Sequence, residues 1–171
     1  MTAFDDCRSI EERSMAVLRP FIRQRAYDGQ YVVTAKGPLA RELQVSAGNV
    51  LFNGPGDAVY GIEIKAELCN QHGNLFLETW SNRARFTVGW LYTLKTDILL
   101  YHFIEDDEVW RLPFGRLREW AFHEGRIYAF PERRQMKHSQ PNDTWGRCVP
   151  TAVLEREAGA RRIPLRTSRA A

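Results

Sequence analysis

The sequence is poor in the features that mark membrane-spanning and disulfide-stabilised proteins. It contains no apolar run close to the roughly 18–20 residues that a membrane helix needs. It has only three cysteines, widely spaced, and an odd count of this kind argues against a disulfide framework. Residues 1–8 are polar, which is typical of neither a signal peptide nor a transit peptide. We therefore expect a cytoplasmic protein that does not bind a membrane.

Several common catalytic motifs are also missing. There is no phosphate-binding P-loop and no G-x-G-x-x-G after an expected strand, so a nucleotide cofactor is not expected. Cys69 and His72 form a lone C-x-x-H without the second pair that a zinc site requires. No Ser/His/Asp or Cys/His arrangement is evident. The remaining candidates for chemistry are carboxylates, amides and basic side chains.

The charges that are present are unevenly distributed. Residues 111–171 hold 13 Lys and Arg against 6 Asp and Glu, whereas residues 1–110 hold 11 against 15. An acidic half beside a basic half suits a protein that holds a metal at one place and phosphates at another. A solvated surface with a disordered basic tail at 161–171 explains the charges more simply, so charge alone does not identify a partner.

Hydrophobic periodicity predicts one domain over residues 1–160, of the α/β or α+β class. A helix is expected over 9–25. Three strands joined by short loops, at 49–53, 58–67 and 74–83, predict an antiparallel three-strand meander within a central mixed sheet flanked by helices. The other expected elements are strands at 31–33, 97–104, 109–112, 127–130 and 148–154, and helices at 89–96 and 114–123.

The strand at 58–67 contains the segment Glu63-Ile64-Lys65. Alternation along a strand places Glu63 and Lys65 on one face and Ile64 on the other, core-facing side. An E-x-K segment is common, and by itself it is typical of an exposed polar strand face. The expected pairing of the strands makes it more informative.

In that pairing, a hairpin loop over 68–73 places Glu63 opposite Glu78. Like charges in facing positions destabilise a sheet, and a bound divalent cation is the simplest compensation. The first hairpin places Gly48 or Asn49 opposite Glu63. Asp57 lies six residues from Glu63 along the strand, about 20 Å away, so we interpret it as a turn residue.

These segments together resemble the core of the PD-(D/E)xK nuclease superfamily, with the first Asp replaced by Asn. The resemblance rests on Gly48-Asn49-Val50, followed after fourteen residues by Glu63-Ile64-Lys65. The stretches 74–82 and 89–94, with Asp97, are similar to small nuclease-like proteins of phages and prophages. The resemblance covers about residues 9–104 and implies a restriction-endonuclease-like fold.

By this resemblance, the chain would be an endonuclease that hydrolyses the phosphodiester bonds of DNA and uses Mg²⁺ or Mn²⁺. Asn49, Glu63 and the Ile64 carbonyl would hold the ion, and Lys65 would position or activate the attacking water. Glu78 would be a further ligand or a supporting group. Glu12 on the first helix is an accessory candidate, although a solvated carboxylate explains it more simply. The candidate DNA-binding residues are Asn82, Arg83, Arg85, Arg133, Arg134 and Lys137.

Asn49 departs from the family pattern, because a neutral amide binds a hard cation more weakly than a carboxylate does. The chain can be an inactivated Asp-to-Asn form, a degenerate nuclease that still binds DNA, or an active enzyme in which Glu78 replaces the missing ligand. Two further functions remain as alternatives. One is a non-catalytic DNA-binding protein, and the other is a protein-interaction factor of a mobile element. The oligomeric state, monomer or homodimer, stays open.

Overall fold

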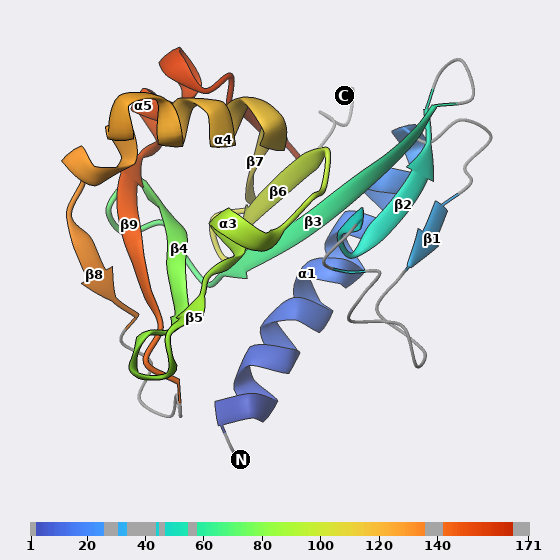
Figure 1. The fold of residues 1–171 in the computed structure, drawn as a ribbon. Coiled ribbons are helices and arrows are strands. Elements are labelled where there is room, and N and C mark those ends of the chain that lie inside the picture. The colour runs from blue at the N-terminus through green and yellow to red at the C-terminus, as the bar shows by residue number, and fades with distance from the viewer. Residues whose placement is uncertain are drawn as a thin grey trace.

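The computed structural model describes residues 3–25, 31–33, 44, 47–54, 58–135 and 142–165. It is a mixed α/β structure with two open sheets and flanking helices (Figure 1). The broad fold class expected from the sequence is therefore confirmed.

The larger sheet has six strands in the order β1-β2-β3-β6-β7-β10. Only the neighbours β3 and β6 are parallel, and every other pair is antiparallel, so the sheet is mixed as expected. Its strands are β1 (Tyr31–Val33), β2 (Val50–Asn53), β3 (Val59–Glu67), β6 (Ile98–Phe103), β7 (Glu108–Pro113) and β10 (Arg161–Pro164). An antiparallel three-strand meander is present, but β1, β2 and β3 form it.

The prediction that the strand at 74–83 pairs with β3 is wrong. This strand, β4 (Asn74–Asn82), belongs to a second sheet in the order β5-β4-β9-β8. The place beside β3 is taken by β6, a strand that is buried along nearly its whole length. The pairing continues past the strand ends, because the backbone N–H groups of Ile104 and Glu105 donate to the carbonyls of Glu67 and Leu68. Both edges of β3 are therefore hydrogen-bonded, one to β2 and the other to β6, and β4 has no free edge of β3 with which to pair.

The second sheet is completed by β5 (Thr87–Val88), β8 (Glu132–Arg134) and β9 (Trp145–Pro150). In Figure 1 it lies to the left of β3, with α4 (Phe114–Phe122) and α5 (Thr151–Glu157) across its upper end. The other helices are α1 (Ala3–Arg25), α3 (Trp90–Thr93) and the short 3-10 helices η3 (Arg83–Arg85) and η4 (His123–Ala129).

Three expectations for the C-terminal part need correction. Residues 127–130, expected as a strand, fall mainly in η4, where Ile127 is buried. The strand expected at 148–154 ends at Pro150 and continues as α5. The tail expected to be disordered from 161 onwards instead begins with β10, which pairs with β7. The apolar periodicity that predicted these elements was weak, and contacts distant in sequence decide them.

The six-stranded sheet has a hydrophobic cluster on each face. One face packs on α1, with Leu18, Ile22, Ile62 and Ile64 in the cluster. Ser14 Oγ also lies 2.9 Å from His102 Nδ1 on β6, which fixes the helix to this sheet. The opposite face packs against the second sheet, α4 and α5. Within the described ranges, no helix is both long and apolar enough to cross a bilayer.

Candidate functional site

Glu63 and Lys65 form an ion pair on the face of β3 that is turned away from α1. Lys65 Nζ lies 2.7 Å from Glu63 Oε1, and the Glu63 side chain is only 1% exposed. The other carboxylate oxygen, Oε2, is buried and has no hydrogen-bond partner among the described residues. Burying a carboxylate oxygen without a hydrogen-bond partner costs free energy. This atom is therefore a candidate to bind a cation or to accept a hydrogen bond from a ligand.

Asn49 lies directly across from Glu63. The β2–β3 register pairs Val50 with Ile62, and one step further places Asn49 beside Glu63. The Asn49 side-chain oxygen accepts a 2.7 Å hydrogen bond from the Ile64 backbone N–H, and its own backbone N–H donates to the Glu63 carboxylate. Of the two residues expected opposite Glu63, Gly48 and Asn49, the register therefore selects Asn49.

Gly48 permits this close approach of the two strands. Its φ is +88°, a conformation that side chains rarely adopt, and a Cβ here would lie 2.4 Å from the Ile62 carbonyl carbon and oxygen. The Gly48-Asn49 dipeptide therefore acts as a unit, in which the glycine brings the backbone against β3 and the asparagine contacts Glu63 and Ile64.

Glu78 reaches the site by a different route from the predicted one. It is not opposite Glu63, because β4 is not paired with β3. It comes from the second sheet and lines the same cavity as Lys65, and its Oε1 accepts a hydrogen bond from the Trp90 backbone N–H at 3.2 Å. Gly89 allows this contact, since a Cβ there would lie 2.4 Å from the Glu78 carbonyl oxygen. Lys65 Nζ also lies 5.8 Å from the centre of the Trp90 ring.

The cavity between α1 and the two sheets has a volume of about 190 Å³. It is acidic, because three glutamates and a single lysine contribute charged groups to its wall. Several of its residues were not among the candidates from the sequence. The lining consists of Ile10, Glu11, Lys65, Ala66, Glu67, Phe76, Glu78, Trp90, Tyr101 and Gln135.

The helix glutamate at this cavity is Glu11, and Glu12 is not among the lining residues. Glu11 lies three residues before the buried Ser14 and seven before the buried Leu18, which places it on the helix face that packs on the sheet. Glu12 is the next residue along the helix and therefore does not lie on that face. The spacing to Ser14 and Leu18 is the sequence signal that could have identified Glu11.

Burial and neighbouring charges shift the pKa values of Glu63, Glu78 and Lys65. Burial raises the pKa of Glu63, Lys65 opposes this effect, and the nearby charge of Glu11 adds to the rise. Burial also raises the pKa of Glu78, again opposed by Lys65. Burial alone would lower the pKa of Lys65, but Glu63, Glu78 and Glu11 outweigh burial and raise it. The site therefore places three carboxyl groups around a single ammonium.

A second polar pair closes one side of the cavity. The hydroxyl of Tyr101 on β6 donates a hydrogen bond to Glu67 of β3, and it accepts one from the Phe76 backbone N–H at 3.3 Å. Burial, together with the Glu67 charge, raises the pKa of Tyr101 well above its usual value. Tyr101 thus stays neutral and ties the two sheets together beside the ion pair.

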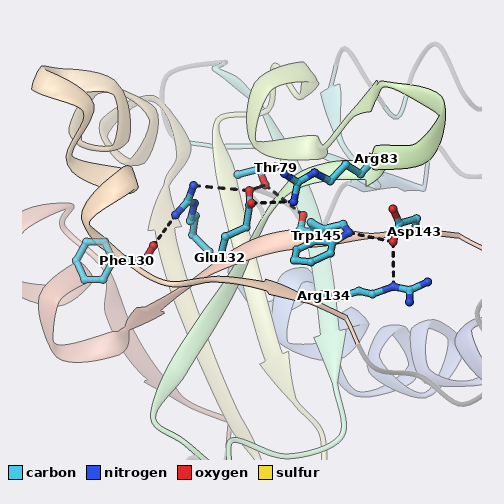
Figure 2. A network of polar contacts seen from close by, with 8 residues as sticks. Thr79, Arg83, Phe130, Glu132, Arg134, Asp143 and Trp145 are labelled. Carbon is cyan, nitrogen blue, oxygen red and sulfur yellow. Dashed lines mark hydrogen bonds and ion pairs between the residues drawn. The ribbon is translucent and has the colours of Figure 1, made fainter.

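Two of the arginines that we expect to bind DNA form ion pairs within the protein (Figure 2). Arg83 lies 3.1 Å from Glu132 and 4.7 Å from the centre of the Trp145 ring. Arg134 lies 2.9 Å from Asp143, whose carboxylate also accepts a hydrogen bond from the Trp145 indole N–H. The charges of these two arginines are thereby partly neutralised.

Arg133 differs from Arg83 and Arg134 in its surroundings. The β8–β9 register pairs it with Gly146, and Gly146 in turn pairs with Glu78. Arg133 therefore lies on the same sheet face as Glu78, about 10 Å away across two strand spacings. It is exposed and makes no ion pair within the part of the chain that is described.

The remaining candidates are placed as follows. Asn82 caps η3, its side-chain oxygen accepting a 3.1 Å hydrogen bond from the Arg85 backbone N–H. Arg85 is exposed. Lys137 and Asp57 lie outside the described residues.

The described residues include no group of three or more His, Cys, Asp or Glu side chains placed to hold a metal ion. The residue across from Glu63 is an amide, Asn49, and not a carboxylate. Comparison of the chain with protein-family models, curated proteins and solved structures gave no match. The site is therefore interpreted from its own geometry.

Proposed function

We propose that the chain has a restriction-endonuclease-like fold and the active-site framework of a metal-dependent DNA endonuclease of the PD-(D/E)xK type, and that Asn49 holds it in a weakly metal-binding form. The observation that carries this proposal is the buried, unpartnered Oε2 of Glu63, beside the Lys65 ammonium and across from Asn49.

The fit of a divalent cation can be judged from the groups present. Hard cations bind carboxylate and amide oxygens, and Glu63 Oε2 is a buried oxygen that lacks a partner in the described structure. Glu63 would hold the ion, with position 49 and the Ile64 carbonyl beside it. The amide of Asn49 carries no charge, so the affinity for the ion should be lower than with Asp at this position.

An acidic cavity repels the phosphates of DNA unless positive charge is supplied. Lys65 provides one ammonium, on a side chain that is 27% exposed and lines the cavity. A bound divalent ion would add the remaining charge, polarise the phosphodiester and lower the pKa of a bound water. Lys65 would hold the attacking water by a hydrogen bond and offset the charge that develops on the phosphate oxygens. The charges of Glu63, Glu78 and Glu11 raise the pKa of Lys65 and favour its protonated form.

The substrate phosphates have a suitable contact on the adjacent sheet. Arg133 lies on the face that carries Glu78, with Gly146 and the Phe76 ring that covers it between the two residues. Arg85 extends from the loop after β4. These two residues are better candidates for phosphate contacts than Arg83 and Arg134, which already pair with carboxylates.

A DNA-binding protein that does not cleave is the second candidate. This second candidate is favoured because the Asn49 side chain is uncharged and because its oxygen already accepts a hydrogen bond from Ile64. An aspartate could keep that hydrogen bond, because a carboxylate oxygen is also an acceptor, and would place negative charge where the amide NH₂ now lies. Asn49→Asp is thus a conservative change that separates the two candidates.

The experiment is a plasmid-nicking assay with Mg²⁺, Mn²⁺ or a chelator. We expect Asn49→Asp to cleave DNA in the presence of metal, and Asn49→Asp combined with Glu63→Ala or Lys65→Ala to be inactive. Asn53→Asp is the matched control, since it adds the same charge at the other end of β2. Equal cleavage by the parent chain and Asn49→Asp would show that position 49 is not a ligand. An Asn49→Asp variant that binds DNA without cleaving it would favour the second candidate.

A further inference from the structure

The loop between β4 and β5 presents an aromatic side chain to solvent. Residues 83–88 are all exposed, and Phe86 is 84% exposed, more than any other large hydrophobic residue in the described structure. Exposed single hydrophobics are common, but a nearly fully exposed phenylalanine at a loop tip is not. In Figure 1 this loop extends beyond the end of the four-stranded sheet, next to β5.

The loop holds Phe86 in an unfavourable backbone conformation. Its φ is +54° and ψ is 29°, the left-handed region that favours glycine. The Phe86 backbone N–H donates to the Arg83 carbonyl at 3.1 Å, and Ser81 Oγ donates to the Thr87 carbonyl at 3.4 Å. The Asn82 cap on Arg85 completes these contacts. The tip is thus held by its own hydrogen bonds with the aromatic ring directed away from the core.

The base of the loop is anchored to the second sheet. The Arg83 backbone N–H donates to the Asp143 carbonyl at 2.8 Å, and the Arg83 guanidinium stacks on Trp145 and pairs with Glu132 (Figure 2). This anchoring would keep the position of Phe86 fixed relative to β4, the strand that carries Glu78.

The loop lies close to the candidate active site. The Gly89 backbone N–H donates to the Thr79 carbonyl at 2.8 Å, and Gly89 packs against Glu78. Phe86 is only three positions before Gly89 in the chain, which limits their separation to about 10 Å. The segment 82–88 contains two arginines and no carboxylate. Arg83 pairs with Glu132, whereas Arg85 makes no ion pair among the described residues. An aromatic ring beside such a positive charge is the combination that stacks on a base while holding the adjoining phosphate.

We propose that the loop 82–88 is a nucleobase wedge, in which Phe86 stacks on an unpaired base and Arg85 contacts the neighbouring phosphate. This inference rests on the proposed function and adds a substrate class to it. A ring fixed at a loop tip stacks most readily on a base that is already unpaired, because no base pair has to be opened. The preferred ligand is therefore DNA with single-stranded character near the cleavage site, such as a flap, a branch or an unpaired end.

The test measures binding of the parent chain and its variants to fluorescent single-stranded, flap and fully paired DNA of equal length. We expect the parent to prefer flap and single-stranded DNA. Phe86→Ala should lose roughly five- to a hundredfold in affinity for them, the range of one base–aromatic stacking contact. Phe86→Trp should retain binding. Val59→Ala is the matched control, since Val59 is an apolar residue that is 59% exposed at the distant end of β3. The affinity of Val59→Ala for each DNA should equal that of the parent.

Two further measurements make the result specific. A 2-aminopurine base at the unpaired position should be quenched on binding the parent and less so on binding Phe86→Ala. Phe86→Gly should unfold at the same temperature as the parent or above it, because glycine adopts positive φ readily, while binding as weakly as Phe86→Ala. This would separate loss of stacking from loss of folding.

The outcomes separate this inference from the proposed function. Equal affinity of Phe86→Ala and parent for flap DNA would overturn the wedge, even if Asn49→Asp cleaves DNA. Dependence on Phe86 without cleavage by Asn49→Asp would support the wedge and overturn the nuclease. A parent that binds no DNA but self-associates through Phe86, seen as a dimer by sedimentation that Phe86→Ala dissociates, would overturn both.

Discussion

The side-chain oxygen of Asn49 accepts a 2.7 Å hydrogen bond from the Ile64 backbone N–H, between the two charged residues of the Glu63-Ile64-Lys65 segment. Through this bond and its own backbone N–H, Asn49 contacts both Ile64 and the preceding residue, Glu63. The residue is thus fixed beside the buried carboxylate. A change of one atom in this side chain, from nitrogen to oxygen, alters the charge of the site while preserving its shape.

Lys65→Met should destabilise the fold, because it leaves the buried carboxylate of Glu63 without its cation. Removing one partner of a buried pair costs about 3 kcal/mol or more. The pKa of Glu63, already raised by burial, should rise further once Lys65 is gone. A raised folded-state pKa gives stability that is complete below the unfolded value of 4.5 and lost as pH increases through the folded value.

The loss in Lys65→Met should therefore be larger at pH 8 than at pH 5. Urea unfolding at the two pH values measures it. Lys95→Met, which changes an exposed lysine, should shift the free energy of unfolding by no more than about 0.5 kcal/mol at either pH. A loss in Lys65→Met that is equal at both pH values would mean that Lys65 does not lower the pKa of Glu63 in the folded protein.

Gly48→Ala should destabilise the protein by more than about 1 kcal/mol, because an alanine is incompatible with φ of +88° and its Cβ would overlap the Ile62 carbonyl. Gly115 on α4 is the matched control, since a Cβ there meets nothing within 4 Å. Gly115→Ala should instead stabilise by roughly 0.5–1 kcal/mol as a helix residue. Thermal or urea unfolding compares them, and a neutral Gly48→Ala would show that the approach of β2 to β3 does not depend on this glycine.

Arg133→Glu and Arg134→Glu should differ in their effect on DNA binding, although the residues are neighbours. Arg133 lies on the face of Glu78 and makes no ion pair in the described structure, whereas Arg134 pairs with Asp143. We expect Arg133→Glu to weaken DNA binding and to reduce the slope of log affinity against log salt by about 1, as the loss of one phosphate contact predicts. Arg134→Glu should leave the slope nearly unchanged. The opposite ranking would place the DNA on the other face of the second sheet.

The part of the site that the sequence predicts is the part built from local pairing. The short hairpin between β2 and β3 fixes which residues face each other, and Asn49 accordingly lies across from Glu63. The alternation along β3 likewise places Glu63 and Lys65 together. Hairpin register depends on residues close in sequence, so it can be worked out without knowledge of the rest of the fold.

The route of Glu78 to the site could not be predicted in this way. Local pairing alone would place β4 beside β3 as the next strand of the meander. That position is instead occupied by β6, which follows β4 in the sequence and pairs in parallel with β3. Such a nonlocal choice depends on which strand buries more apolar surface, and β6 is buried on both faces. The ion pairs of Arg83 and Arg134 could not be predicted for the same reason, because their partners Glu132 and Asp143 lie on other strands or loops.

The central claim is that Glu63 and position 49 form a divalent-cation site, and titration calorimetry with Mn²⁺ tests it most directly. The parent chain should bind Mn²⁺ weakly, Asn49→Asp should bind at least about tenfold more tightly, a gain of about 1.4 kcal/mol, and Asn49→Asp combined with Glu63→Gln should lose that gain. Because the pKa of Glu63 is raised, affinity should decline on acidification at a pH above the 4.5 of an ordinary glutamate. Equal Mn²⁺ affinity in the parent, Asn49→Asp and the double variant would contradict the account.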